Sequence, residues 1–224
     1  MRRNRPLRFL ITAGPTREYI DPVRFISNDS SGKMGFALAA AAKGRGHRVM
    51  LVHGPVAIQP ARGVRTISVL SAAEMLAACR QQWPRQNILI MAAAVADYAP
   101  TRTARTKLKK QPGPRALRLK PTVDILEALS RDRRPEQLVI GFALEDRNAR
   151  RNAEAKLRGK RLDAIVLNRP ETIGSERASV EWLVTGRAWE VLPASSKLRL
   201  AQRLIRAAEA LYAEPRASAE SASP

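Results

Sequence analysis

The sequence is poor in the residues that mark secreted, membrane-spanning or metal-binding proteins. It has one cysteine, Cys79, among 224 residues, which excludes an internal disulfide framework and indicates a reducing compartment. Its two histidines, His47 and His53, have no partner at metal-ligand or catalytic-triad spacing. The longest apolar run, residues 88–96, is about half of what a bilayer span needs. These absences predict a soluble, cytoplasmic protein with no membrane partner.

The two ends of the chain differ in composition from the rest. Residues 1–6 form a basic extension whose following apolar stretch is too short for a signal peptide. Residues 213–224 are small, polar and proline-containing, which is typical of disorder. We therefore expect one domain over residues 7–212, followed by a disordered tail.

Acidic residues are half as frequent as basic ones: 20 Asp and Glu against 40 Lys and Arg give a formal net charge of +20. Such a surplus favours partners with negative charge, such as nucleotides, phosphates or nucleic acid. Aromatic residues make up only 4% of the chain, and the acid-free segment 101–120 has none. Because nucleic-acid modules commonly stack bases on aromatic side chains, the composition disfavours nucleic acid as the partner.

Hydrophobic patterning predicts strands and helices that alternate along the chain. Several predicted strands are continuously apolar, as expected of strands buried on both faces of a parallel sheet. The strands are expected at residues 8–13, 48–53, 64–69, 87–93, 137–144 and 162–168, and the helices at 31–45, 71–82, 122–131, 145–160 and 195–212. Residues 179–185 and 188–192 flank Gly186 and Arg187 like a β-hairpin. The expected fold is α/β, a Rossmann-like doubly wound, mostly parallel sheet with a C-terminal β-hairpin.

Two connections are far longer than the usual βα loop of about 2–6 residues. They cover residues 14–30 and 94–117, and both follow strands that we expect to be central. Such folds place their sites at the carboxyl ends of parallel strands, near the point where the strand order reverses. We therefore expect the two loops to face each other across a binding site.

The first long loop ends in residues that suit a helix start. Asn28 to Ser31 are capping types, and Gly32, Lys33 and Gly35 follow. This combination predicts either an anion cradle at a helix N-terminus or an ordinary capped helix with glycines for close packing. A GxxxxGK[ST] phosphate loop and a GxGxxG dinucleotide fingerprint are both excluded by the spacing.

The second long loop and a later helix supply polar residues with two interpretations each. Asp97 could bind a ribose hydroxyl or magnesium, or could cap the loop start. Lys107, in an acid-free segment, fits either a lid over a triphosphate or a solvated basic loop. Lys156 and Lys160 share a helix face, which suits either phosphate binding or contact with solvent.

Taken together and in order, these segments resemble phosphopantothenoylcysteine synthetase, the pantothenate–cysteine ligase of coenzyme A biosynthesis. The resemblance runs from residue 7 to about residue 212. It depends on ITAGPTRE (11–18), DPVRFISNDSSGKMG (21–35), AAAVADYAP (92–100), KLKK (107–110), VDIL (123–126) and VIGFALE (139–145). It implies that 4'-phosphopantothenate and L-cysteine are joined through an acyl-nucleotidate (acyl-cytidylate), with release of pyrophosphate and nucleoside monophosphate. CTP is favoured over ATP, with Mg²⁺ assisting.

The resemblance also implies roles for individual residues. Asn28 would contact the acyl carbonyl, Lys107 would promote formation of the acyl-nucleotidate, and Arg24 would support catalysis. Nucleotide contacts are implied for Asp97, Lys107, Val123, Asp124, Ile125, Leu126, Phe142, Lys156 and Lys160, and Asp97 is also a candidate metal ligand. Contacts to substrate or intermediate are implied for Ser30, Ser31, Gly32, Lys33, Ala93, Ala94 and Val95.

The resemblance carries expectations about partners as well. We expect a homodimer, no flavin site, and a separate decarboxylase for the next step, because the sequence begins directly at the first strand of the synthetase region. The charge of +20 exceeds what this chemistry requires. It leaves one alternative of a different class, a basic nucleic-acid-binding module on a Rossmann-like fold.

Overall fold

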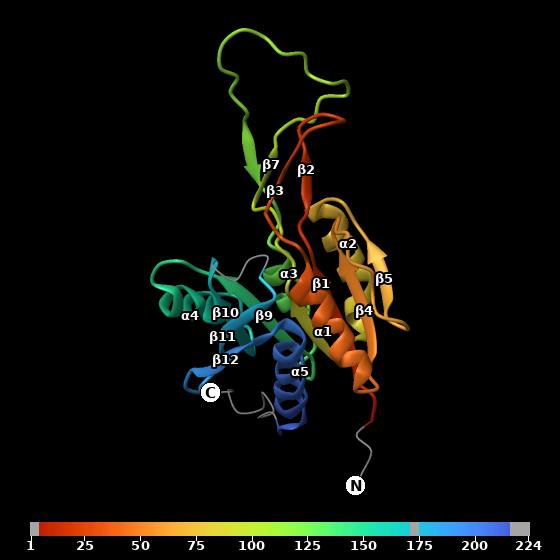
Figure 1. Cartoon of the computed structure of the whole chain (residues 1–224), viewed down its shortest axis with the longest axis vertical. Helices are drawn as coiled ribbons and strands as arrows, with labels where there is room; N and C mark the ends of the chain where they lie inside the picture. Colours follow the sequence, from red (N-terminus) through yellow and green to blue (C-terminus); the bar gives the residue numbers. More distant parts are fainter. Residues whose placement is uncertain (1–4, 171–174, 216–224) are drawn as a thin grey trace, which may run out of the picture.

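A computed structural model describes residues 5–170 and 175–215 of the chain. Its centre is an eight-stranded sheet in the order β12-β11-β10-β9-β6-β1-β4-β5 (Figure 1). The parallel strands are β1 (Arg8–Ala13), β4 (Arg48–His53), β5 (Arg65–Ser68), β6 (Ile88–Met91), β9 (Leu138–Leu144) and β10 (Ala164–Asn168). The antiparallel strands β11 (Arg177–Val184) and β12 (Glu190–Ser196) extend one edge. The predicted doubly wound sheet with its C-terminal hairpin is confirmed.

Helices cover both faces of the sheet. On one face lie α1 (Lys33–Gly44) and α5 (Lys197–Ala213); on the other lie α2 (Ala72–Gln82), the short 3-10 helix η1 (Trp83–Arg85), α3 (Ile125–Arg131) and α4 (Ala149–Gly159). Successive residues of a strand point to opposite faces, so Phe9 and Ile11 pack against the first layer while Leu10 packs against the second. Most of β1 is therefore buried on both sides, which explains its continuous apolar run.

Helix starts are where the structure differs most from the predicted ranges. The first helix begins at Lys33, after Gly32 in a left-handed conformation, and not at residue 31. The third begins at Ile125 because the Asp124 side chain accepts the Glu127 N–H, and the fourth begins at Ala149 after a left-handed Asn148. The hydrophobic pattern marks each helix correctly but extends into the polar residues ahead of it.

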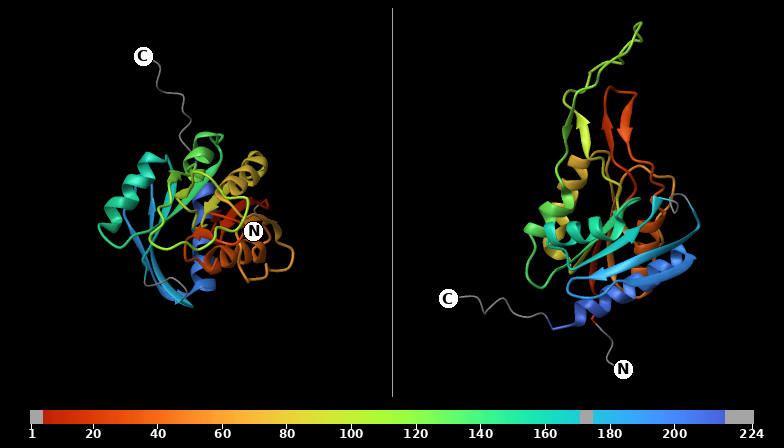
Figure 2. Two further views of the ribbon diagram at one scale, coloured as in Figure 1. Left: turned by 90° about the horizontal axis from the view of Figure 1, so that it is seen from above. Right: turned by 90° about the vertical axis from the view of Figure 1, so that its left-hand side faces the viewer.

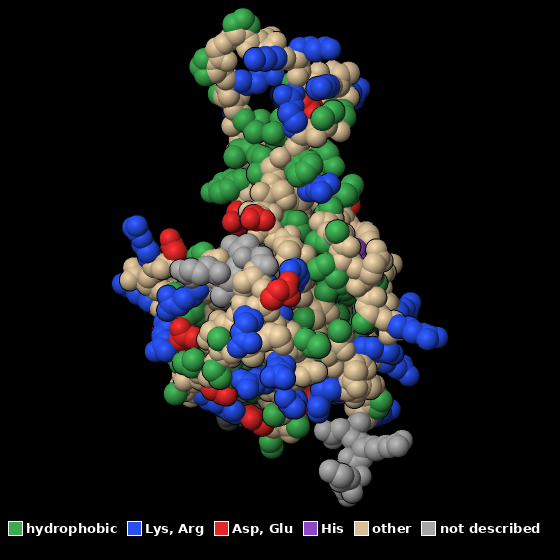
Figure 3. Space-filling view, in the orientation of Figure 1, with side chains coloured by type: hydrophobic (Ala, Val, Ile, Leu, Met, Phe, Trp, Pro, Cys, Tyr) green, Lys and Arg blue, Asp and Glu red, His purple; other side chains and the backbone are tan. Residues whose placement is uncertain are grey.

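The two long loops form an arm that projects from the carboxyl end of the sheet, which the sequence did not predict (Figure 2). The arm consists of residues 17–27 and 98–121. Its first part is the ribbon of β2 (Arg17–Tyr19) and β3 (Phe25–Ser27); its second is the ribbon of β7 (Tyr98–Pro100) and β8 (Leu119–Pro121), joined by the acid-free loop. Apolar side chains gather at the base of the arm and basic ones near its tip (Figure 3).

The predicted terminal segments lie largely beyond what can be described. Residues 1–4 of the basic extension and 216–224 of the predicted tail are outside the described residues, and α5 ends at Ala213. Among the helices of residues 5–170 and 175–215, none has both the length and the hydropathy needed to cross a membrane.

Candidate functional site

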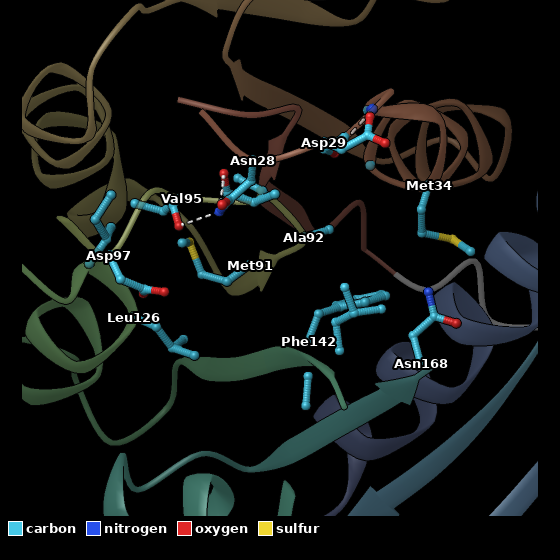
Figure 4. A pocket seen from close by; sticks show the side chains of 18 of the residues that line it. Asn28, Asp29, Met34, Met91, Ala92, Val95, Asp97, Leu126, Phe142 and Asn168 are labelled. Atoms are coloured by element: carbon cyan, nitrogen blue, oxygen red, sulfur yellow. Dashed lines mark hydrogen bonds between the residues drawn. The ribbon is translucent and has the colours of Figure 1, made fainter. Parts of the chain in front are cut away.

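A cavity of 670 Å³ opens at the carboxyl ends of the parallel strands, where the strand order reverses between β1 and β6 (Figure 4). Two loops from neighbouring strands meet there: Ala94 donates to the Gly14 carbonyl at 2.9 Å and Thr16 donates to the Ala94 carbonyl at 3.4 Å. This is the location expected for a ligand site in an open α/β sheet. The prediction that the two long loops face each other is correct.

All but two of the residues that the resemblance implies for the site line this cavity. From the first loop and the start of α1 come Asn28, Ser30, Ser31, Gly32 and Lys33. From the second loop come Ala93, Ala94, Val95 and Asp97. From the residues before α3 and its first turn, from β9, and from the last turn and C-cap of α4 come Val123, Asp124, Ile125, Leu126, Phe142, Lys156 and Lys160. Residues far apart in the sequence thus surround one cavity.

The start of α1 lines the cavity without a capping side chain. Gly32 precedes the helix with φ of +73°, a conformation that disfavours a residue with a Cβ. Instead of capping deeper N–H groups, Ser30 and Ser31 accept at 3.4–3.5 Å from the nearby N–H groups of Gly32 and Lys33. The first turn and its partial positive charge therefore face the cavity, which suits an anion.

Asn28 joins the two loops across the cavity. Its side-chain amide donates to the Val95 carbonyl at 2.9 Å and lies 3.4 Å from the Ala94 carbonyl (Figure 4). Thr16 fixes the same loop, since its hydroxyl accepts the Ala96 N–H at 2.9 Å. The exposed Asn28 side chain is thus held by the backbone that the resemblance places around the reacting group.

One end of the cavity combines two lysines with a carboxylate. Lys160 forms an ion pair with Asp124, and Lys156 donates to the Phe142 carbonyl at 2.8 Å. Burial, and then the neighbouring Lys160, lower the pKa of Lys156. Burial raises the pKa of Asp124, but the hydrogen bonds from Lys160 and the Glu127 N–H, together with the charges of Lys160 and Lys156, outweigh it, and the net direction is down. Their charges are partly balanced within the protein.

Several lining residues were missed by sequence reasoning. Asn168 ends β10, and Lys197 begins α5 with Ser196 as its cap. The remaining missed residues are Met34, Met91, Ala92, Thr122, Ala143, Leu144 and Glu145, whereas Asp29 and Gly35 belong to the predicted anion cradle and also line the cavity. Asn168 could have been found, because it follows a parallel strand at its carboxyl end. Lys197 could not, because its position depends on how the hairpin returns α5 to the sheet.

Arg24 and Lys107 do not line the cavity; both lie on the arm. Arg24 forms an ion pair with the fully buried Asp21 and donates to the Leu108 carbonyl at 2.7 Å. Leu108 in turn donates its N–H to Asp21 at 3.1 Å. These contacts attach the loop that carries Lys107 to the β2–β3 ribbon. The Lys107 side chain itself is exposed on the arm.

A protein-only metal cluster is absent from the part of the chain that the structure describes. No three His, Cys, Asp or Glu side chains there come together as a metal-binding group. Asp97, exposed on the cavity wall, would fit a magnesium ion held mainly by phosphate oxygens, which is how this ion usually binds with nucleotides.

The fold and the cavity together define a Rossmann-like α/β protein with a cationic ligand cavity at its topological switch point. Within this class the chain belongs to the family described as the DNA/pantothenate metabolism flavoprotein C-terminal domain, whose model matches residues 5–211.

Relatives of known structure and sequence agree with this assignment. The crystal structure of the C-terminal domain of coenzyme A biosynthesis bifunctional protein CoaBC covers 94% of this chain and 98% of its own, with 38% identity and a TM-score of 0.81. CoaBC of Bacillus subtilis (strain 168) is 43% identical over 90% of this chain and 51% of its own length. A cysteine/cysteine sulfinic acid decarboxylase from an unknown prokaryotic organism is 49% identical over 72% of this chain and 45% of its own length. The chain thus spans about half the length of these curated relatives.

Proposed function

We propose that this protein ligates 4'-phosphopantothenate to L-cysteine in coenzyme A biosynthesis. The carboxylate attacks the α-phosphate of a nucleoside triphosphate, CTP in preference to ATP, which gives an acyl-nucleotidate and pyrophosphate. The cysteine amine then displaces the nucleoside monophosphate and forms the amide. Family membership and the likeness to the CoaBC C-terminal domain support this proposal.

The observation that carries the proposal is the composition of the cavity wall. Residues implied by the resemblance come from five segments of the chain, yet they line one cavity with cationic groups at both ends. Activation of a carboxylate by a triphosphate requires positive charge where negative charge develops. Lys156 and Lys160 at one end, and Lys33 with the open start of α1 at the other, supply it.

Asn28 would act on the acyl group. Its amide nitrogen donates to the Val95 carbonyl at 2.9 Å and, in a longer contact of 3.4 Å, to the Ala94 carbonyl, and the longer contact can be exchanged for the acyl carbonyl when substrate binds. Donors held in this way stabilise a carbonyl oxygen as its charge increases. Asp97 would hold a magnesium ion together with the phosphates, and this ion would neutralise phosphate charge when bound.

A homodimer is part of the proposal. Apolar side chains of the arm, among them Val23, Tyr98 and Leu119, are 56%, 53% and 44% exposed. An exposed apolar patch on a projecting element supports a contact with a second copy. Such a contact would also bring the arm's Arg24 and Lys107 near the partner's cavity or hold them over their own.

The test is incubation with phosphopantothenate, cysteine and each nucleotide in turn, with pyrophosphate release as the measurement. Pyrophosphate should form only when phosphopantothenate and a nucleotide are both present, fastest with CTP. Release of orthophosphate and a nucleoside diphosphate would indicate an acyl-phosphate ligase instead. A filter-binding titration against duplex DNA at moderate salt tests the nucleic-acid alternative.

A further inference from the structure

Three charged side chains from three distant segments meet at the end of the cavity formed by α1 and α5. Lys33 is the first residue of α1 and Lys197 the first of α5, and both line the cavity. Glu176, directly before β11, forms an ion pair with Lys33. Its backbone carbonyl accepts the Lys197 N–H at 3.1 Å, which fixes the start of α5 beside it.

This group has more positive than negative charge. The hydrogen bond from Lys33, then the charges of Lys33 and Lys197, lower the pKa of Glu176. Partial burial and repulsion from Lys33 lower the pKa of Lys197. One carboxylate thus serves two ammonium groups, and its side chain is 81% exposed, so it can turn into solvent at little cost.

The opposite end of the cavity has more carboxylates around its two lysines, since the charges of Asp124, Glu145 and Asp97 all act to raise the pKa of Lys156. Asp97 and Leu126 lie on one side of the cavity, Met34 and Asn168 on the other (Figure 4). At the first end Lys160 pairs with Asp124. The group formed by Lys33, Glu176 and Lys197 belongs to the second end, next to the uncapped start of α1. That end has room and charge for an additional anion.

We propose that Lys33 and Lys197 bind the diphosphate end of the nucleotide, the part that leaves as pyrophosphate. In the free protein, the Glu176 carboxylate occupies the position that the diphosphate takes when it binds. The assignment of this anion as a leaving diphosphate rests on the proposed function. Lys33 exchanges the Glu176 carboxylate for phosphate oxygens when the ligand enters. Glu176 pairs with Lys33 again when the ligand leaves.

Charge and geometry both favour this exchange. A diphosphate has more negative charge than a carboxylate and can accept from both lysines and from the first N–H groups of α1. Re-pairing of Glu176 keeps two ammonium groups from facing each other without an anion after release. Glu176 should therefore weaken diphosphate binding by competition, whereas Lys197 should strengthen it.

The test is calorimetric titration of the full chain with inorganic pyrophosphate in magnesium-free buffer. Lys197→Met should weaken binding about tenfold or more, because a charge-assisted contact is lost, and Glu176→Gln should strengthen it about threefold. Lys43→Met and Glu190→Gln make the same charge changes on exposed residues away from the cavity and should leave binding nearly unchanged. Lys197→Arg, which keeps the charge, should bind within about threefold of the unmodified protein.

If Lys197→Met and Lys43→Met weaken pyrophosphate binding equally, the net charge of the protein explains the effect and the proposal is overturned. Weaker binding by Glu176→Gln, or no pyrophosphate binding to the unmodified protein at millimolar concentration, would also overturn it. Thermal melting of each variant identifies any that has lost its fold. If Lys197→Met has, Lys197→Arg tests the proposal instead, and its binding should stay within about threefold of the unmodified protein. Since inorganic pyrophosphate binds without catalysis, a protein that binds it as described but makes no amide would contradict only the proposed ligase activity.

Discussion

The cavity and the arm are built from the same two loops, yet they are held by different forces. Around the cavity, the loops are fixed to the sheet itself: Ala94 bonds to Gly14, and Ala96 bonds to Thr16 at 2.9 Å. In the arm, ribbons of three residues per strand are joined by a few contacts, such as Thr103 to the Tyr19 carbonyl at 2.9 Å. The sheet therefore fixes the position of cavity residues, whereas arm residues depend on local hydrogen bonds.

One buried carboxylate accounts for much of the arm's order. Asp21 accepts the N–H groups of Val23 and Arg24 at 2.9 Å, pairs with the Arg24 guanidinium and accepts the Leu108 N–H. The Arg24 side-chain hydrogen bond holds the pKa of Asp21 well below its usual range, against the opposing effect of burial. Arg24, which the resemblance assigns to catalysis, thus has a structural partner on the arm.

The largest expected effect concerns Asn28 in the cavity. Asn28→Asp loses the donor to the Val95 carbonyl and places a carboxylate against carbonyl oxygens. Loss of one oriented donor in such a site costs roughly 3 kcal/mol. We expect nucleotide to bind but amide yield to fall by a factor of about 10² or more, with the acyl-nucleotidate escaping or being hydrolysed. Mass spectrometry of the quenched reaction, with and without cysteine, measures this.

Asn148→Asp is the matched control, since it makes the same change at the start of α4, outside this cavity. It should keep normal activity. A normal amide yield from Asn28→Asp would remove Asn28 from the site.

The next effect concerns the arm. Lys107→Gln should slow pyrophosphate release by a factor of about 10², as loss of a charge partner in the transition state typically does. Lys110→Gln, on the same exposed loop, should have little effect and controls for net charge. An unchanged pyrophosphate burst in Lys107→Gln would mean that the arm lysine is surface charge and that the cavity works without it.

The sequence predicted the cavity better than the arm for a physical reason. Continuous apolar strands and the rule of strand reversal suffice to place the ends of β1, β6 and β9 together, and motif residues such as Asn28 and Lys156 follow the strands they are attached to. The arm has no apolar periodicity, because its ribbons are too short and too exposed to show any. Its shape depends on Asp21, whose buried position no local pattern reveals.

Lys197 shows a second limit of the sequence. It lies in an amphipathic helix, where a lysine ordinarily faces solvent. Only the return of β12 along β11, together with the bond from Lys197 to the Glu176 carbonyl, brings the start of α5 beside α1. Neither a motif nor a periodic pattern can predict the position of a residue that depends on a distant contact of this kind.

A smaller effect is expected where α1 meets the sheet beneath the cavity. A Cβ at Gly35 would lie 2.4 Å from the Ala13 Cβ and 2.9 Å from the Thr12 carbonyl oxygen. Gly35→Ala must therefore shift α1, at a cost of about 1–3 kcal/mol in the free energy of unfolding. Denaturant titration measures it. Gly44→Ala in the same helix, with nothing within 4 Å, should be neutral or slightly stabilising. Equal stabilities would mean that the helix start is not tightly packed.

The smallest effect on the body of the protein is expected from loosening the arm. Asp21→Asn removes the charge that pairs with Arg24 and the acceptor for the Leu108 N–H. Amide exchange in residues 101–118 should become about fivefold faster or more, because these contacts attach the loop. In the unmodified protein the lowered pKa of Asp21 means that its contacts stabilise the arm when the carboxylate is ionised and are lost when it is protonated. The attachment should be complete above about pH 4 and weaken only as the pH falls below it.

Cys79 reports whether the body of the protein responds to that change. Its thiol is fully buried under α2, and burial raises its pKa to about 12, so it should resist alkylation at pH 8 while the sheet is folded. We expect Asp21→Asn to alkylate as slowly as the unmodified protein, since the arm can open without the sheet. Asp146→Asn, on an exposed loop, controls for the loss of one charge and should change neither measurement. Faster alkylation of Cys79 in Asp21→Asn would show that the arm and the sheet unfold as one cooperative unit, and the contrast between them would then be wrong.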